Sequence, residues 1–254
     1  MNNVDGYKEE KRKYWIYLPP SYDKNAQDAY PFMLFLDGSD YLNPIPTTAI
    51  LDGMIKDKII PPCVAVFLEY SNHRFHEYNC NEQFTAFLAN DFMKILRDDN
   101  QLNITEDPKL STIVGLSASG LAAFYAALTY PDVFGNVISQ SPSWVLQQTH
   151  ALETLISNHC QLNQETQFIF EMGSYETIPI DIEFEDGSIQ SLSPIEANKQ
   201  VVASMKNHGL MVTEHEFVGG HNNGCWGVSL PNRIAEICNK RLEEKISLAP
   251  RASI

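Results

Sequence analysis

The chain has 254 residues, a formal net charge of −14 and 44% hydrophobic residues. This length and composition predict a single globular domain over residues 1–254 with a large apolar core. The acidic excess argues against binding to nucleic acid or to anionic membrane surfaces. Five cysteines without C-x-x-C spacing indicate reduced thiols and no metal site. Because the N-terminus lacks an apolar signal core and no 18-residue apolar run occurs, we expect a cytoplasmic protein with no membrane contact.

Apolar runs of strand length alternate with helical patterns along most of the chain. Most of these runs are continuously apolar, which is typical of strands buried on both faces of a parallel sheet. The alternation therefore predicts an α/β fold with a mostly parallel central sheet flanked by helices. Strands are expected at 11–18, 31–36, 63–68, 111–114, 136–140, 167–172 and 212–218, and helices at 47–58, 82–96, 118–130, 149–158, 194–208 and 230–245.

Residues 178–191 follow a different pattern. Isoleucine and phenylalanine alternate with acidic residues up to Asp186-Gly187, and a second short run follows. Alternation on both sides of an Asp-Gly pair is a strong hairpin signal. We expect a small inserted β-hairpin, which could cover a site nearby.

The sequence GLSASG at 115–120 lies between a predicted strand and an alanine-rich helical pattern. Strand, tight turn and helix form the context of a G-x-S-x-G nucleophile elbow, in which the serine hydroxyl stands at the top of the sheet. Ser117 occupies the nucleophile position. Ser119 stands where the second glycine of the motif is expected and is the alternative nucleophile.

A serine nucleophile needs a base and an acid that orients the base. His221 follows the last predicted strand between glycine-rich segments, which let an imidazole approach the serine closely. Glu176 follows the preceding strand and is the candidate acid, with Asp181 and Glu196 as competitors. The order serine, acid, histidine is that of α/β-hydrolases.

Two backbone amides are needed to bind the oxyanion that forms during acyl transfer. Ala118 directly follows the nucleophile and supplies one amide in an elbow. Gly38, in the turn after an early strand, is the candidate for the second.

At these residues the chain resembles the enterochelin esterase family, a branch of the esterase D-like α/β-hydrolases. The resemblance runs from about residue 11 to 241 and rests on YLPPSY at 17–22, FLDG at 35–38, HRFHEYNCNEQF at 73–84, the elbow, GSYE at 173–176 and GGHNNGCW at 219–226. It implies an α/β-hydrolase fold and a triad of Ser117, Glu176 and His221, without a metal or organic cofactor. It also implies hydrolysis of the trilactone backbone of catecholate siderophores.

Four further residues are candidates for substrate binding. Arg74 and Glu77 match the H-R-x-x-E loop of the family, where an arginine could bind a catecholate or carboxylate oxygen. Alternatively, Arg74 and Glu77 pair with each other and shape the loop. Trp144 and Trp226 are candidates for apolar pocket walls, with core packing as the alternative.

The chain also departs from the family pattern. Ser119 replaces a glycine, Asn222 replaces the aspartate usual after the histidine, and the hairpin is inserted after the acid loop. The sequence therefore predicts a serine carboxylic-ester hydrolase acting on a small-molecule ester, with a siderophore trilactone as one candidate. The alternatives are an acyltransferase, a deacylase or thioesterase, and a catalytically silent hydrolase fold that binds a ligand. The pattern does not indicate an oligomeric state.

Overall fold

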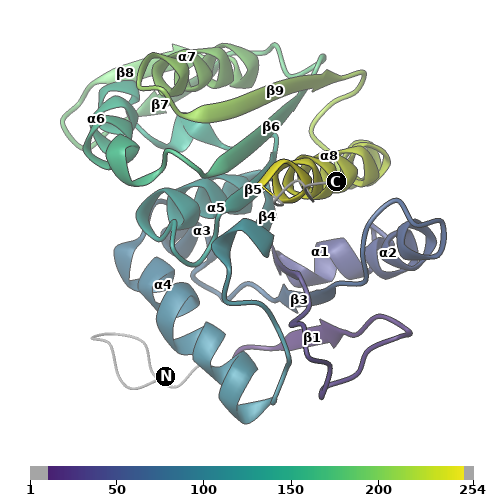
Figure 1. Ribbon diagram of the computed structural model, residues 1–254. Coiled ribbons are helices and arrows are strands. Elements are labelled where there is room, and N and C mark those ends of the chain that lie inside the picture. The colour runs from purple at the N-terminus through teal and green to yellow at the C-terminus, as the bar shows by residue number, and fades with distance from the viewer. Residues whose placement is uncertain (1–10, 249–254) are drawn as a thin grey trace.

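The computed structural model describes residues 11–248, with side chains described up to residue 240. Residues 1–10, where no signal segment is predicted, and residues 249–254 lie outside the described part. A seven-stranded sheet of order β1-β3-β2-β4-β5-β6-β9 forms the centre of the fold (Figure 1). Within this sheet, as described over residues 11–248, β1 pairs antiparallel with β3 and the other neighbouring strands pair parallel. The strands are β1 (Tyr14–Tyr17), β2 (Phe32–Leu36), β3 (Val64–Leu68), β4 (Ser111–Leu116), β5 (Asn136–Gln140), β6 (Gln167–Gly173) and β9 (Met211–Phe217).

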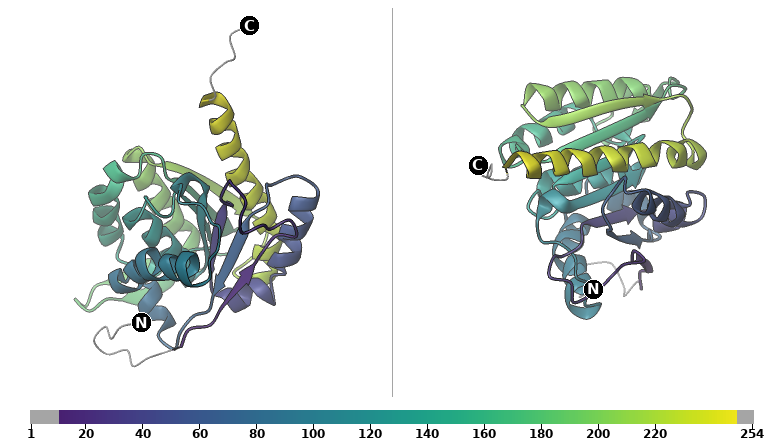
Figure 2. Two further views of the ribbon diagram at one scale, coloured as in Figure 1. Left: turned by 60° about the horizontal axis from the view of Figure 1, so that its bottom comes forward. Right: turned by 45° about the vertical axis from the view of Figure 1, so that its right-hand side comes forward.

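Helices cover both faces of this sheet, as the views in Figures 1 and 2 show. One face carries α1 (Gly38–Leu42), α2 (Thr47–Lys56) and α8 (Asn223–Leu248). The other carries α3 (Arg74–Tyr78), α4 (Glu82–Ala86), α5 (Ala118–Thr129), α6 (Thr149–His159) and α7 (Pro194–Asn207). Among the described residues, no helix is both long and apolar enough to cross a membrane. The mostly parallel α/β sheet flanked by helices is confirmed.

Alternate residues of each central strand enter different cores, because successive side chains of a strand point to opposite faces. In β2, Phe32, Leu34 and Leu36 pack on the α5 side, whereas Met33 and Phe35 pack on the α8 side. All five are buried. The continuous apolar run is thus explained by two cores rather than one.

The hairpin prediction is confirmed by β7 (Ile180–Glu183) and β8 (Ile189–Leu192), which pair antiparallel. Its described hydrogen bonds to the rest of the chain come from Gln148 and Thr149, at the start of α6. These contacts fix the hairpin beside α6, and none of them reaches the site described below.

Several helix boundaries differ from the predictions. Residues 73–80, expected as a polar loop, contain the short helix α3, and α1 was not expected. Five-residue helices are too short to show a periodic apolar pattern. The predicted helix 82–96 is α4 followed by π-helical turns at Phe87–Phe92 and Ile95–Asp99. The last helix begins at Asn223, seven residues before the predicted Leu230.

Candidate active site

The sheet changes direction of winding between β2 and β4, which are parallel neighbours although β3 lies between them in the chain. Ligands of open α/β sheets bind at the carboxyl ends of the strands at such a switch point. Gly38 follows β2 and Ser117 follows β4 there. Glu176 and His221 follow β6 and β9, whose carboxyl ends lie farther along the same edge.

Ser117 is held in a strained turn. Its backbone has φ 54° and ψ −122°, outside the region that L-residues usually occupy. A Cβ on Gly115 would lie 2.1 Å from the backbone oxygen of Ser119, so the turn requires glycine at that position. The strand therefore passes into α5 through the sharp elbow predicted from the sequence.

Ser119 closes this elbow and is fully buried. Its hydroxyl donates to the backbone oxygen of Leu116 at 2.8 Å and accepts from the Leu116 amide at 2.9 Å. Both bonds lie within the turn, so this hydroxyl is engaged and faces the protein interior. Of the two serines, Ser117 is the accessible one.

The structure brings Ser117, His221 and Glu176 into one hydrogen-bonded chain. His221 Nε2 lies 2.9 Å from Ser117 Oγ, and His221 Nδ1 lies 2.7 Å from Glu176 Oε2. The Glu176 side chain is only 3% exposed, whereas that of His221 is 43% exposed. A buried acid thus orients an accessible imidazole toward the serine.

Glu176 is surrounded by donors as well as by apolar atoms. Burial raises the pKa of a carboxyl group, but here hydrogen bonds from His221, Ser141 and the Gly173 amide outweigh it and lower the pKa of Glu176. Ser141 Oγ donates at 2.5 Å and the Gly173 amide at 2.9 Å, both to Oε1. Glu176 is therefore an ionised hydrogen-bond acceptor at neutral pH.

Trp226 packs directly on the imidazole. Its ring meets that of His221 edge to face, with ring centroids 4.8 Å apart. Its indole nitrogen donates to Ser141 Oγ at 2.9 Å. Trp226 is 4% exposed, so it supports the histidine and the acid from within rather than forming a broad pocket wall.

Asn222, one of the residues that depart from the family pattern, directly precedes the last helix, α8. Its side-chain oxygen accepts from the Cys225 amide at 3.1 Å, which is the bond of a helix N-cap. Asparagine and aspartate are about equally good N-caps, so the substitution at position 222 is compatible with this bond next to His221.

The two candidate oxyanion donors are the first residues of helices. The amides of Gly38, in α1, and Ala118, in α5, precede the first intrahelical hydrogen bonds, so neither has an acceptor within its helix. A Cβ on Gly38 would lie 2.8 Å from the Phe67 carbonyl carbon, so glycine is required for this close approach. The Asp37 amide faces Tyr78 Oη at 3.3 Å instead.

Arg74 and Glu77 do not pair with each other, which makes that alternative wrong. Arg74 Nε donates to Asp37 Oδ1 at 2.8 Å, and its second nitrogen forms an ion pair with Asp37 Oδ2. Glu77 forms a buried ion pair with Arg12. Arg74 therefore reaches the turn that carries Gly38, whereas Glu77, only 4% exposed, faces away from solvent.

Trp144 belongs to the core. It is 1% exposed, lies edge to face with Phe124 and Phe170, and donates its indole hydrogen to Asn198 at 2.9 Å. The expectation that it forms a pocket wall is not met, and the core-packing alternative holds.

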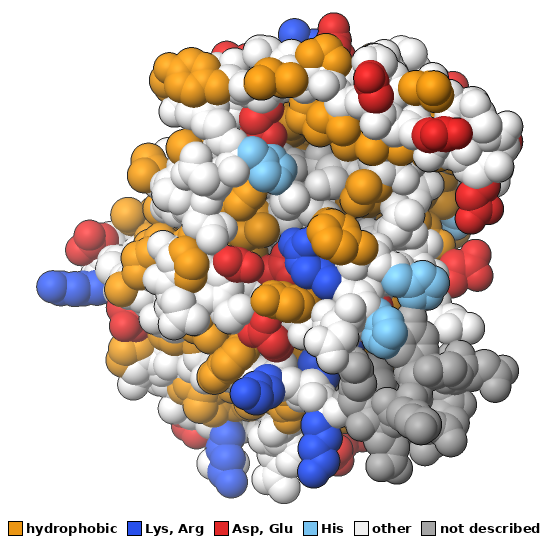
Figure 3. Space-filling view, turned by 180° about the vertical axis from the view of Figure 1, so that it is seen from behind, with side chains coloured by type: hydrophobic (Ala, Val, Ile, Leu, Met, Phe, Trp, Pro, Cys, Tyr) orange, Lys and Arg blue, Asp and Glu red, His pale blue; other side chains and the backbone are white. Residues whose placement is uncertain are grey.

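Charge is unevenly distributed along the chain and over the surface. No Lys or Arg occurs between Lys109 and Lys199, a stretch that includes the elbow, the acid loop and the hairpin. On the face drawn in Figure 3, acidic side chains are spread over most of the surface, and several of the basic ones lie toward the bottom. Positive charge near the site must therefore come from other segments, of which Arg74 is the example described above.

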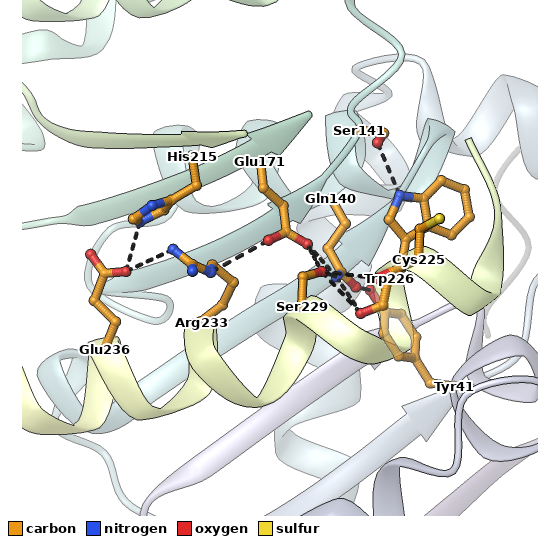
Figure 4. Close-up of polar contacts among 10 residues, drawn as sticks. All are labelled: Tyr41, Gln140, Ser141, Glu171, His215, Cys225, Trp226, Ser229, Arg233 and Glu236. Carbon is orange, nitrogen blue, oxygen red and sulfur yellow. Dashed lines mark hydrogen bonds and ion pairs between the residues drawn. The ribbon is translucent and has the colours of Figure 1, made fainter. Parts of the chain in front are cut away.

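A buried polar network adjoins the site on the α8 side of the sheet (Figure 4). Gln140 donates to Glu171 Oε1 at 2.6 Å and to the Trp226 carbonyl at 3.0 Å. Burial raises the pKa of Glu171, against the lowering effect of Gln140, Ser229 and Arg233. The network joins β5 and β6 to the start of α8, and hence to Trp226.

Two hydroxyls in the site were not predicted from the sequence. Ser141 and Ser143 follow β5 in the segment Ser141-Pro142-Ser143, and Ser143 Oγ lies 3.2 Å from Ser117 Oγ. A Ser-Pro-Ser segment is typical of an ordinary turn, so composition gives no signal of this contact. Within residues 11–240, no three His, Cys, Asp or Glu side chains are grouped so that they could hold a metal ion.

Comparisons with known proteins identify the family of this chain. Residues 7–237 match the model of a family described as "Putative esterase". The chain belongs to this esterase family.

The iron(III) enterobactin esterase of Dickeya dadantii is 24% identical over 220 residues, covering 86% of this chain and 49% of the relative. The uncharacterized protein YbbA of Bacillus subtilis is 28% identical over 225 residues, covering 82% of this chain and 83% of YbbA. The chain thus spans about half the length of the enterobactin esterases it matches.

The crystal structure of the enterobactin esterase FES from Shigella flexneri in the presence of enterobactin is similar in fold. Its TM-score is 0.74 at 22% identity, covering 90% of this chain and 56% of that one. The esterase family and its fold are therefore established, and the family resemblance noted from the sequence is confirmed.

Proposed function

We propose that this protein is a serine carboxylic-ester hydrolase in which Ser117 is the nucleophile, His221 the general base and Glu176 the acid. The observation that carries the proposal is the hydrogen-bonded chain from Ser117 Oγ through both imidazole nitrogens to the Glu176 carboxylate, at 2.9 and 2.7 Å. The strained backbone of Ser117 supports it, because such strain gathers at functional sites.

The proposed reaction begins when His221 Nε2 takes the Ser117 proton and Oγ attacks the ester carbonyl carbon. The amides of Gly38 and Ala118 donate to the oxyanion. His221 then gives the proton to the departing alcohol, which leaves an acyl group on Ser117. Water, activated by the same imidazole, attacks this acyl group and releases the acid.

Arg74 carries guanidinium hydrogens beyond those bonded to Asp37, and these are suited to donate to an oxygen atom of the substrate. Its guanidinium is held beside the Gly38 turn by Asp37, and it lies 5.3–5.8 Å from the ring centroids of three aromatic side chains, Tyr70, Phe75 and Tyr78. Two of the relatives bear the name iron(III) enterobactin esterase, which gives iron(III) enterobactin as their substrate. We propose a siderophore trilactone or a related small ester as the substrate. The cytoplasmic location stays a prediction.

The test is hydrolysis of p-nitrophenyl acetate and butyrate by wild type and Ser117→Ala. Loss of the nucleophile should lower kcat by about 10⁴-fold or more. The matched control is Ser119→Gly, which restores the family residue two positions away and should retain activity. Unchanged turnover by Ser117→Ala would refute the proposal. A panel comparing trilactone siderophores with simple acyl esters then identifies the substrate class.

A further inference from the structure

The segment after β5 is attached to the elbow by its backbone. The Ser117 amide donates to the Gln140 carbonyl at 2.8 Å, and the Ser143 amide donates to the Ser117 carbonyl at 3.1 Å. These two bonds place the side chain of Ser143 beside that of Ser117. The hydroxyl oxygens lie 3.2 Å apart, and both residues are half-buried.

The direction of this hydrogen bond follows from the protons available. The ionised Glu176 carboxylate can only accept, so His221 carries its hydrogen on Nδ1 and presents a lone pair at Nε2. Ser117 has one hydroxyl hydrogen, and it is directed to that lone pair. Ser143 must therefore be the donor in the contact between the two serines.

We propose that Ser143 is a further catalytic residue, whose hydroxyl donates to Ser117 Oγ and stabilises the charge on that oxygen as the acyl group leaves. The inference rests on the proposed function, because it assigns a hydrogen-bond donor to the proposed nucleophile. The role is distinct from that proposed for the Gly38 and Ala118 amides, which is to donate to the carbonyl oxygen of the substrate.

The effect belongs mainly to deacylation. Water forms a bond to the acyl carbon and gives a proton to His221, and the bond from that carbon to Oγ then breaks. The electron pair stays on Oγ, which takes the proton from His221, while Ser143 keeps its own. In acylation the same hydrogen bond engages a lone pair of the attacking oxygen in the ground state, so its net benefit there is smaller.

Stopped-flow measurement of acylation and deacylation with p-nitrophenyl butyrate tests this. Ser143→Ala should slow deacylation about tenfold, as expected for loss of one hydrogen bond, and change acylation less than about threefold. Because the acyl-enzyme accumulates, kcat and KM should fall together while kcat/KM is nearly unchanged. The matched pair Ser143→Thr and Ser143→Val separates hydroxyl from shape: Thr should restore deacylation, and Val should not.

Three results would overturn the inference: wild-type deacylation in Ser143→Ala, equal rates in the Thr and Val variants, or an effect confined to acylation. Ser117→Ala is measured in parallel. If Ser117→Ala still turns over the ester, the proposed function fails. If it is inactive and Ser143→Ala or Ser143→Val deacylates like wild type, only the role of Ser143 fails.

Discussion

Among residues 11–240, two glutamate–histidine pairs have the same oxygen–nitrogen distance, and one of these two pairs is part of the candidate active site. His221 meets Glu176 at 2.7 Å, and His215 on β9 meets Glu236 on α8 at 2.7 Å. In the first pair, the other ring nitrogen of His221 faces Ser117, a serine in a strained turn. In the second pair, the further contacts are made by the glutamate: Glu236 accepts from Arg233 and lies 3.1 Å from Lys240. A carboxylate beside an imidazole is therefore not a site in itself, because the third partner decides its chemistry.

Replacing each histidine by alanine should give the largest contrast. His221→Ala removes the proposed base and should lower kcat by about 10⁴-fold or more. His215→Ala loses a partly exposed pair, so it should cost about 1 kcal/mol of unfolding free energy or less and leave kcat within about twofold. Ester hydrolysis and urea denaturation measure both. A large loss of kcat in His215→Ala would contradict the distinction.

Replacing Glu176 and Glu236 should give the same contrast as replacing the two histidines, with a smaller change in kcat. Glu176→Gln keeps the shape but removes the charge that fixes the His221 tautomer, so kcat should fall by about 10²- to 10⁴-fold. Glu236→Gln should leave kcat within about twofold, since the described partners of Glu236 are His215, Arg233 and Lys240, and none of them belongs to the candidate site. Activity of Glu176→Gln equal to wild type would mean that a serine–histidine pair suffices.

Ser141→Ala tests how far the surroundings of an acid matter. Ser141 donates to Glu176 and accepts from Trp226, so its loss should leave the carboxylate less well oriented and lower kcat about tenfold. Trp226→Phe, which keeps the ring beside His221 but removes the indole hydrogen, should have a smaller effect in the same assay. If Ser141→Ala matched wild type, Ser141 would serve only the fold.

The smallest predicted effect is on the pH dependence of stability. The pKa of Glu176 is lowered in the folded state. Its contribution to the free energy of unfolding is therefore present above the usual glutamate pKa of about 4.3 and is lost as pH falls through the lowered pKa. The stability difference between wild type and Glu176→Gln should therefore narrow toward acid pH.

The expected pH dependence of stability has the opposite sign for Glu171. Its pKa is raised, so its contribution to the free energy of unfolding is present below about pH 4.3 and falls as pH rises through the raised pKa. The stability difference between wild type and Glu171→Gln should thus decrease with rising pH. Chemical denaturation from pH 3 to 8 measures both slopes, and parallel slopes would refute the contrast.

The sheet and the places of Ser117, His221 and Glu176 after their strands could be predicted because the signals are local. Buried parallel strands appear as continuous apolar runs, and turns rich in glycine mark where Ser117 and His221 follow a strand. Glu176 was predicted from its place directly after a strand, and the structure puts it there, after β6. Its role as the acid stays a proposal.

Other features depend on contacts between distant segments, which composition does not report. The partner of Arg74 is Asp37 and that of Glu77 is Arg12, pairs separated by 37 and 65 positions. The start of α8 was missed because Gly224, Gly227 and Pro231 argue against a helix, although the Asn222 cap starts one there.

The elbow also has a consequence for how such proteins are found by pattern. Position 115 excludes every side chain, because a Cβ there would overlap the backbone of residue 119. Position 119 accommodates a hydroxyl, provided that it bonds back to residue 116. A search that requires glycine at both positions treats two different constraints as one, and it would overlook esterases whose elbows use serine at the second.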